Sequence, residues 1–309
     1  ALGGGEAFYA PSANSLICEH HQKTRATAIS IHQTALYVGI IGSGYLTGYI
    51  ADNFGWRTAF YLFGGFGIIL GIIFYFRIKD SKVLLKEIAI TENRQSVWEV
   101  IKIFFKKPTA VFLALAFASF QFGGVGFLTW MPTYLYENFH FSLARAGFDS
   151  TFYHFVAAFF GVMAGARISD IFSSRIVGFR GMVQMTGLFI MVPVVFFMTK
   201  SDSILIVYLT LTVFGFCRGI YDSNIFAALY DVIEMPYRST ATGVMLMFAF
   251  VVGSLAPYLL GLLKPVFGLS NGLASLSLSY LLAGIFILIA LLFSYKKDSI
   301  KEELLQADA

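Results

Sequence analysis

Charge is scarce in this sequence: 13% of its 309 residues are Asp, Glu, Lys or Arg, whereas 57% are hydrophobic. A soluble domain carries about a quarter charged residues. This deficit excludes an ordinary soluble protein, and the long apolar runs predict a chain that crosses a membrane several times. The formal net charge of +4 is too small to indicate a nucleic-acid partner, so we expect none.

Cysteine and catalytic motifs are also nearly absent. The two cysteines, Cys18 and Cys217, provide no disulfide framework. The sequence has no HExxH motif, no GxSxG beside a usable base, no phosphate-binding loop and no metal-ligand cluster. We therefore expect no enzyme, no metal site and no cofactor. Energy for any transport would come from an ion gradient or from the gradient of the solute itself.

The hydrophobic residues form nine long segments. Since only helices and closed barrels satisfy all backbone groups in lipid, and these runs do not alternate, we predict an all-α polytopic membrane protein. The segments are residues 1–18, 28–51, 58–77, 109–136, 148–168, 181–199, 203–230, 240–263 and 273–295.

The basic residues are distributed unevenly between the two sets of loops. Of the 22 Lys and Arg residues, 17 fall in one set and four in the other, while Arg218 lies inside a segment. Because cytoplasmic loops are enriched in Lys and Arg, the rich set, which includes the C-terminus, is expected on the cytoplasmic side of the cell membrane.

The longest loop runs from Arg77 to Lys107. Its second half, Val97 to Lys107, places Trp98, Ile101 and Phe105 on one helical face. This pattern is typical of a helix lying at the membrane surface, and a plain amphipathic linker is the alternative.

An internal repeat relates the second and eighth segments. At an offset of 213 residues, nine of 31 positions are identical, from Arg25 and Arg238 to Gly55 and Gly268. This offset spans six segments, which predicts two six-helix halves in parallel orientation. The same offset places the start of the first half about a hundred residues before Ala1. We therefore expect three helices and part of a fourth to be missing, so this chain alone should not transport.

Several motifs carry a family resemblance. GWRTAF (Gly55 to Phe60), the paired starts at Arg25 and Arg238, and Ala166-Arg-Ile-Ser-Asp170 followed by Arg175 all occur at matching places. Together with two six-helix halves and a basic central loop, they resemble the major facilitator superfamily, whose bundle has 12 helices.

The resemblance implies a domain division and a set of gating residues. Residues 1–78 would be helices 4–6 of the N-terminal half, 79–108 a cytoplasmic central loop, 109–296 the complete C-terminal half, and 297–309 a cytoplasmic tail. Asp170, Arg175, Arg25 and Arg238 match positions with gating roles. Ala166 replaces the usual Gly and Ile171 replaces a basic residue, which weakens the match at the inner motif.

The branch of the family is less well defined by the sequence. GEAFYAP (Gly5 to Pro11) and Trp130-Met-Pro-Thr-Tyr resemble both anion:cation symporters and spinster-type lipid transporters. The run Arg218-Gly-Ile-Tyr-Asp-Ser-Asn is more similar to sugar-acid and organic-anion carriers of the first branch.

The segment 203–230 is the centre of the functional prediction because it carries Arg218 and Asp222 near its middle. Charges at that depth are costly and usually functional. At spacings of three and four residues, Tyr221 and Asp222 would share a helical face with Arg218, so we predict that this face lines a solute pathway. The alternative is an internal ion pair that only fixes helix packing.

The predicted roles follow from side-chain chemistry. The planar fork of Arg218 suits a carboxylate. Asp222 would neutralise Arg218 in the empty site or take up a proton, and Glu6, at similar depth, is the rival proton carrier, with a bond to a missing helix as its alternative. Further candidates for solute binding are Asn224, Gln121, Trp130, His154, His32 and Gln33. A hydrogen-bonded packing role is the alternative for the two histidines, and a membrane-interface anchor is the alternative for Trp130.

The leading hypothesis is a proton-coupled secondary transporter of a small organic anion, working as a monomer in the lipid bilayer by alternating access. A carrier of lysolipids or other amphiphiles on the same fold is an alternative. A sensor that binds solute without moving it is another.

Overall fold

The computed structural model describes residues 25–77, 97–173 and 175–300, apart from the side chains of residues 25–31, 33, 34 and 97. Every regular element among these residues is a helix, as predicted. The chain divides at Arg94 and Gln95 into two compact units, inside the expected central loop.

The N-terminal unit contains α2 (Arg25–Phe54) and α3 (Trp56–Arg77). The turn between them is a single glycine, Gly55, whose φ of +81° is easily adopted only without a side chain. The segment predicted over residues 1–18 lies outside the described part of the chain.

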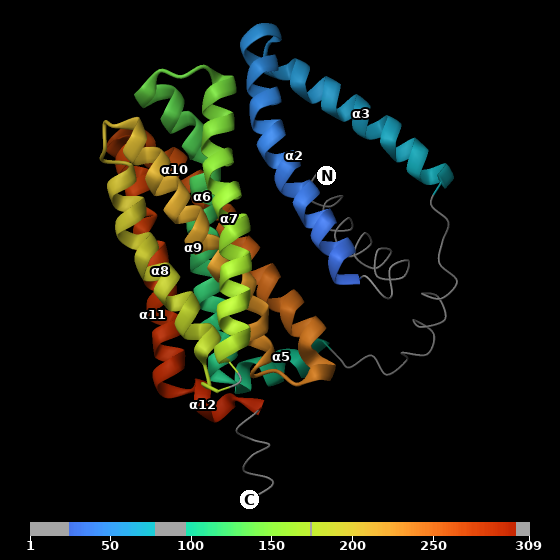
Figure 1. Ribbon diagram of the computed structural model, residues 1–309, viewed down its shortest axis with the longest axis vertical. Helices are drawn as coiled ribbons and strands as arrows, with labels where there is room; N and C mark the ends of the chain where they lie inside the picture. The colour runs from blue at the N-terminus through green and yellow to red at the C-terminus, as the bar shows by residue number, and fades with distance from the viewer. Residues whose placement is uncertain (1–24, 78–96, 174, 301–309) are drawn as a thin grey trace, which may run out of the picture. The chain divides into compact units, whose positions relative to one another are not determined.

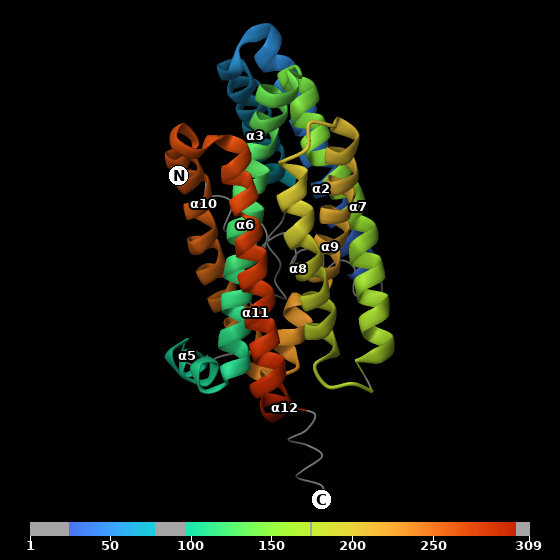
Figure 2. The same cartoon turned by 90° about the vertical axis from the view of Figure 1, so that its left-hand side faces the viewer.

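The C-terminal unit contains α5 (Val97–Lys106), α6 (Pro108–Phe139), α7 (Leu143–Phe172), α8 (Phe179–Met198), α9 (Ile204–Tyr230), η1 (Met235–Tyr237), α10 (Arg238–Ser275), α11 (Ser277–Phe293) and α12 (Tyr295–Asp298). Helices α6 to α11 run side by side as a bundle, with α5 and α12 at one end (Figure 1, Figure 2). Within it, α6 packs on α10 and α11, and α9 packs on α7 and α8.

Six stretches of the described residues are long and apolar enough to cross a membrane. One of them, Met235–Phe293, is 59 residues long, which is well beyond the roughly 20 residues of a single crossing. The helix axis breaks within it at Gly268, where φ is 72°. The break separates the eighth and ninth predicted segments. Gly268 is also the repeat partner of Gly55, and both glycines have a positive φ.

Glycines set the close approach of α7 and α9. A Cβ atom on Gly219 would lie 2.1 Å from the Ala158 carbonyl oxygen, and one on Gly215 would lie 2.1 Å from that of His154. In the opposite direction, a Cβ on Gly161 would meet the Phe216 carbonyl oxygen at 2.1 Å. Small residues at such positions allow membrane helices to pack backbone to backbone.

The helix α5 has an inner and an outer face. Val100 and Phe104 are buried, whereas Trp98 and Phe105 are largely exposed. The amphipathic helix is therefore present as predicted, with one apolar face on the bundle and bulky apolar side chains also on the open face. Its position at a membrane surface stays a prediction.

The start of the expected C-terminal tail is part of the bundle. Asp298 is buried and its carboxylate accepts a hydrogen bond of 2.9 Å from the backbone N–H of Thr109, in the first turn of α6. Since Lys107, at the N-cap, gives no side-chain cap, a carboxylate from the far end of the chain takes that role.

Candidate functional site on α9

Arg218 and Asp222 lie together on α9, as their spacing predicts. Arg218 Nε is 3.4 Å from Asp222 Oδ2, and the two side chains are 17% and 33% exposed. The pair is therefore neither sealed in the core nor fully solvated. The distance of 3.4 Å is long for a charge-assisted hydrogen bond, which favours competition between an incoming anion and Asp222 for the guanidinium.

The other side of the guanidinium faces the bundle. Arg218 Nη1 is buried without a hydrogen-bond partner, and the position of a Cβ on Gly124 would be 3.5 Å from it. The guanidinium carbon is also 5.8 Å from the centre of the Phe120 ring. Such a cation–π contact stabilises a charge where water is scarce.

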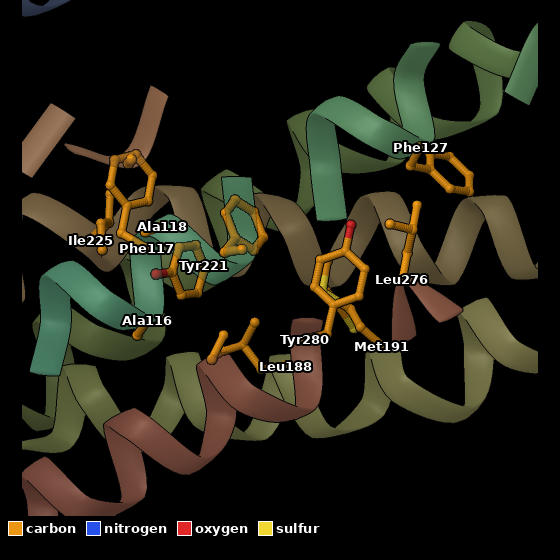
Figure 3. Packing of buried hydrophobic residues seen from close by; sticks show 14 of the residues in the cluster. Ala116, Phe117, Ala118, Phe127, Leu188, Met191, Tyr221, Ile225, Leu276 and Tyr280 are labelled. Carbon is orange, nitrogen blue, oxygen red and sulfur yellow. The ribbon is translucent and has the colours of Figure 1, made fainter. Parts of the chain in front are cut away.

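Tyr221 turns away from this exposed pair into the core. It is fully buried among the core residues that Figure 3 shows. Its ring stacks on that of Phe120, with the ring centres 4.1 Å apart. The expectation that it shares the open face with Arg218 and Asp222 is corrected by this geometry. Consecutive residues of a helix point about 100° apart, so Asp222 can be partly exposed while Tyr221 next to it is buried.

Asn224 joins α9 to α7. Its amide nitrogen donates to the carbonyl oxygen of Gly165 at 3.4 Å and to that of Ile220 at 3.0 Å. The side chain is fully buried. In this structure the residue bridges two helices, and its role in binding stays a prediction.

His154 and Gln121 are also enclosed. His154 is fully buried, both ring nitrogens lack hydrogen-bond partners, and its ring lies 5.0 Å from that of Phe214. Gln121 is 9% exposed, and its backbone carbonyl oxygen lies 3.3 Å from the Cβ position of Gly253 on α10. Neither side chain is open to solvent as Arg218 and Asp222 are.

Trp130 holds α6 to α10. Its indole N–H donates to the Pro257 carbonyl oxygen at 3.1 Å, and Lys264 Nζ lies 5.4 Å from the ring centre. Lys264 also pairs with Glu137 at 2.5 Å. The interface-anchor interpretation of Trp130 fits this cluster as well as solute binding does.

The candidates of the N-terminal part are only partly described. Glu6 lies outside the described residues, as do the side chains of Arg25 and Gln33, and His32 is half-buried. The predicted approach of Glu6 to Arg218 and the gating role of Arg25 stay predictions.

At the end of the bundle that carries α12, Asp170 meets a residue that the sequence did not single out. Arg180 is 3.5 Å from Asp170 and 3.8 Å from Asp231, whereas Arg175 is exposed. The sequence feature that could have pointed to Arg180 is its position in the same basic loop as Arg175. Arg238 donates to the carbonyl oxygens of Tyr230 and Ile233, which places a cation at the C-terminus of α9. Gating by these residues stays a prediction.

Tyr295 completes this cluster. Its hydroxyl donates to Asp231 Oδ2 at 3.0 Å. Burial and the neighbouring carboxylate raise the pKa of Tyr295 well above its ordinary value. The phenol therefore stays a neutral donor throughout the physiological range, which suits a fixed contact between α12 and α9.

A second Arg–Asp pair lies near the opposite end of the bundle. Arg145 Nε is 3.3 Å from Asp149 Oδ2, which also accepts a hydrogen bond from the Tyr208 hydroxyl at 2.5 Å. Asp149 is buried although Arg145 is exposed. This pair was not predicted from the sequence, although its spacing of four residues is the same as that of Arg218 and Asp222.

Two polar cavities lie away from α9's central pair. One of about 320 Å³ is lined by the ends of α6 and α8, including Tyr134 and Lys200. The other, of about 260 Å³, is lined by Tyr230, Asp231 and Arg238. Neither is lined by Arg218 or Asp222. No cluster of His, Cys, Asp and Glu fit to hold a metal occurs among the residues described.

Comparison with known proteins adds a family likeness. The sequence profile described as Major Facilitator Superfamily matches residues 1–257. The hexuronate transporter of Bacillus subtilis (strain 168) is 25% identical over 296 residues, covering 92% of this chain and 68% of the relative. The cis,cis-muconate transport protein of Acinetobacter baylyi (strain ATCC 33305 / BD413 / ADP1) is 26% identical over 297 residues, with the same coverage.

Other relatives differ in function or only share the fold. An MFS-type efflux pump of Mycolicibacterium smegmatis (strain ATCC 700084 / mc(2)155) is 22% identical over 264 residues. The alignment covers 84% of this chain and 60% of that pump. Thus the chain spans 60 to 68% of the length of these curated relatives. The crystal structure of a bacterial spinster homologue superposes with a TM-score of 0.77 at 19% identity, covering 96% of this chain and 76% of that one, which supports the fold alone.

Proposed function

Because the chain belongs to the Major Facilitator Superfamily, we propose that its protein is a secondary transporter that moves a small organic anion across the cell membrane by alternating access. The anion is of the sugar-acid or carboxylate type. Two of its relatives are named for hexuronate and muconate, and both compounds are carboxylates.

The observation that carries the proposal is the half-open ion pair of α9. Arg218 is 17% exposed and Asp222 33% exposed within a 27-residue apolar helix. A guanidinium in such a place has to be balanced by an anion, since unpaired charge is costly in an apolar medium. Asp222 balances it in the empty site, and the carboxylate of the solute does so in the loaded site.

Exchange of the two anions provides the proton coupling. When the solute carboxylate takes the guanidinium, Asp222 loses its counter-charge and becomes the proton acceptor of the site. Glu6 is the second candidate for this role. In this proposal the protein is a proton symporter. It acts as a monomer, and its C-terminus lies in the cytoplasm.

Uptake into proteoliposomes containing the full-length protein tests the proposal. The panel contains glucuronate, glucarate and cis,cis-muconate, each with and without an inward proton gradient. Arg218→Lys should reduce uptake at least tenfold, because an ammonium lacks the two-pronged geometry of the guanidinium. Asp222→Asn should retain binding but lose the response to the gradient.

The matched control is Arg145→Lys, which alters an Arg–Asp pair of the same spacing whose arginine is 56% exposed. It should leave uptake unchanged. Wild-type rates in both α9 variants would refute the site assignment. Saturable binding without accumulation would identify a sensor instead, and accumulation of a lysolipid in place of the acids would identify an amphiphile carrier.

A further inference from the structure

The side of Arg218 that faces the core contains a second unpaired polar atom. Tyr280 on α11 is fully buried, and its hydroxyl oxygen, like Arg218 Nη1, has no hydrogen-bond partner. Unpaired buried donors and acceptors are rare in native structures, and a charged donor is the costliest kind. Two such atoms in one region are candidates for a contact made in another state of the protein.

Two consecutive glycines of α6 place both atoms in one region. A Cβ on Gly123 would lie 2.9 Å from the Tyr280 oxygen, and a Cβ on Gly124 would lie 3.5 Å from Arg218 Nη1. Neighbouring Cα atoms are about 3.8 Å apart. Both atoms therefore border the same turn of α6, and a rotation of the long arginine side chain would bring Nη1 toward the Tyr280 oxygen.

The aromatic ring of Tyr280 is held by its neighbours. Tyr280 packs against Phe120 and Phe214 with ring centres 6.0 and 5.6 Å apart. Figure 3 shows Tyr280 and Tyr221 at separate places in the core, with their two hydroxyl groups pointing in different directions. The phenol oxygen is therefore held in place, and the flexible partner is Arg218.

We propose that Tyr280 is a positioning residue of the anion site, an inference that rests on the proposed function. When a solute carboxylate draws the guanidinium away from Asp222, the Tyr280 oxygen accepts a hydrogen bond from Arg218 Nη1. That bond fixes the plane of the guanidinium, so that its opposite edge presents two donors to the carboxylate.

Tyr280→Phe is the main test, because it removes the hydroxyl and keeps the ring. It should raise the KM for uptake about tenfold, the effect of losing one hydrogen bond to a charged group. The maximal rate and the melting temperature should be unchanged, since the hydroxyl has no partner in the present state. The probe is whichever of glucuronate, glucarate and cis,cis-muconate the wild type accumulates fastest.

Tyr221→Phe is the matched control. Its hydroxyl is equally buried and unpaired, but it is not among the atoms nearest to the Cβ positions of Gly123 and Gly124, so KM should not change. Gly124→Ala is the second variant, in which a methyl group would obstruct the movement of Nη1 and raise KM with Tyr280 intact. An unchanged KM in Tyr280→Phe, or an equal rise in Tyr221→Phe, would overturn the inference.

Arg218→Gln, measured alongside, separates the two proposals. If it abolishes uptake while Tyr280→Phe has no effect, only the positioning role fails. If Arg218→Gln transports normally, the anion site itself is misplaced.

Discussion

Two Arg–Asp pairs with the same spacing show how place decides the role of a charged residue. Arg145 is 56% exposed and lies at the start of α7, where water can solvate it. Arg218 is 17% exposed and lies in the middle of α9. Only the second cation depends on a nearby anion, so only the second pair is suited to exchange its carboxylate for that of a solute.

A third ion pair allows a prediction on pH. Lys107 Nζ is 2.8 Å from Glu234 Oε1. Burial alone would raise the pKa of Glu234, but the hydrogen bond and charge of Lys107 outweigh it, and the pKa is lowered. The pair should therefore stabilise the fold above the ordinary glutamate pKa of about 4.3, and the effect should be lost as the pH falls through the lowered value.

Melting temperatures of the wild type and Glu234→Gln between pH 7 and pH 3 would test this. The wild type should be the more stable at pH 7, and the two curves should converge in acid. A difference that is constant down to pH 3 would show that the carboxylate charge is not the cause.

At the scale of elements, the close packing of α7 against α9 leaves no space for a side chain at Gly219. Gly219→Ala would place a methyl group 2.1 Å from the Ala158 carbonyl oxygen and 2.6 Å from the Val162 nitrogen. The two helices would have to separate, which costs about 1–3 kcal/mol or more. Thermal unfolding of the purified protein in detergent should show a lower melting temperature and faster aggregation.

Gly243→Ala on α10 is the matched control, because nothing lies within 4 Å of the Cβ position there. It should be neutral or slightly stabilising, since alanine favours a helix by about 0.5–1 kcal/mol over glycine. Equal melting temperatures for the two variants would show that the α7–α9 contact can relax.

The repeat also has a counterpart in the elements. Gly55 and Gly268, which are related by the offset of 213 residues, both have positive φ. The two helices that precede these glycines have matching sequences. At each glycine the helix axis changes direction. Sequence identity alone predicted the relation, and the shared backbone conformation gives it a physical cause, because only glycine adopts this geometry without strain.

At the scale of the whole molecule, the uneven distribution of Lys and Arg predicts the orientation in the membrane. A green fluorescent protein fused after Ala309 should fluoresce, and alkaline phosphatase at the same place should be inactive, because the C-terminus is expected in the cytoplasm. Phosphatase inserted after Asp202, in the turn between α8 and α9, should be active. The reverse pattern at both sites would contradict the orientation.

The helical class, the approximate segments and the pairing of Arg218 with Asp222 were determined by the sequence itself. These features depend on local physics: apolar length, backbone hydrogen bonding in lipid, and a spacing of four residues. The glycines that allow the close α7–α9 contact are visible in the sequence, but the backbone atoms that they pack against are not.

Which side chains face open space was decided only by the tertiary structure. Tyr221 and Asp222 are neighbours in sequence, yet one is enclosed by Phe120 and the other is 33% exposed. Likewise, Asp298 caps α6 from 189 residues away, and Arg180 rather than Arg175 meets Asp170. Burial and hydrogen bonding of this kind depend on neighbours from distant segments, and a sequence read along one chain does not show which segments those are.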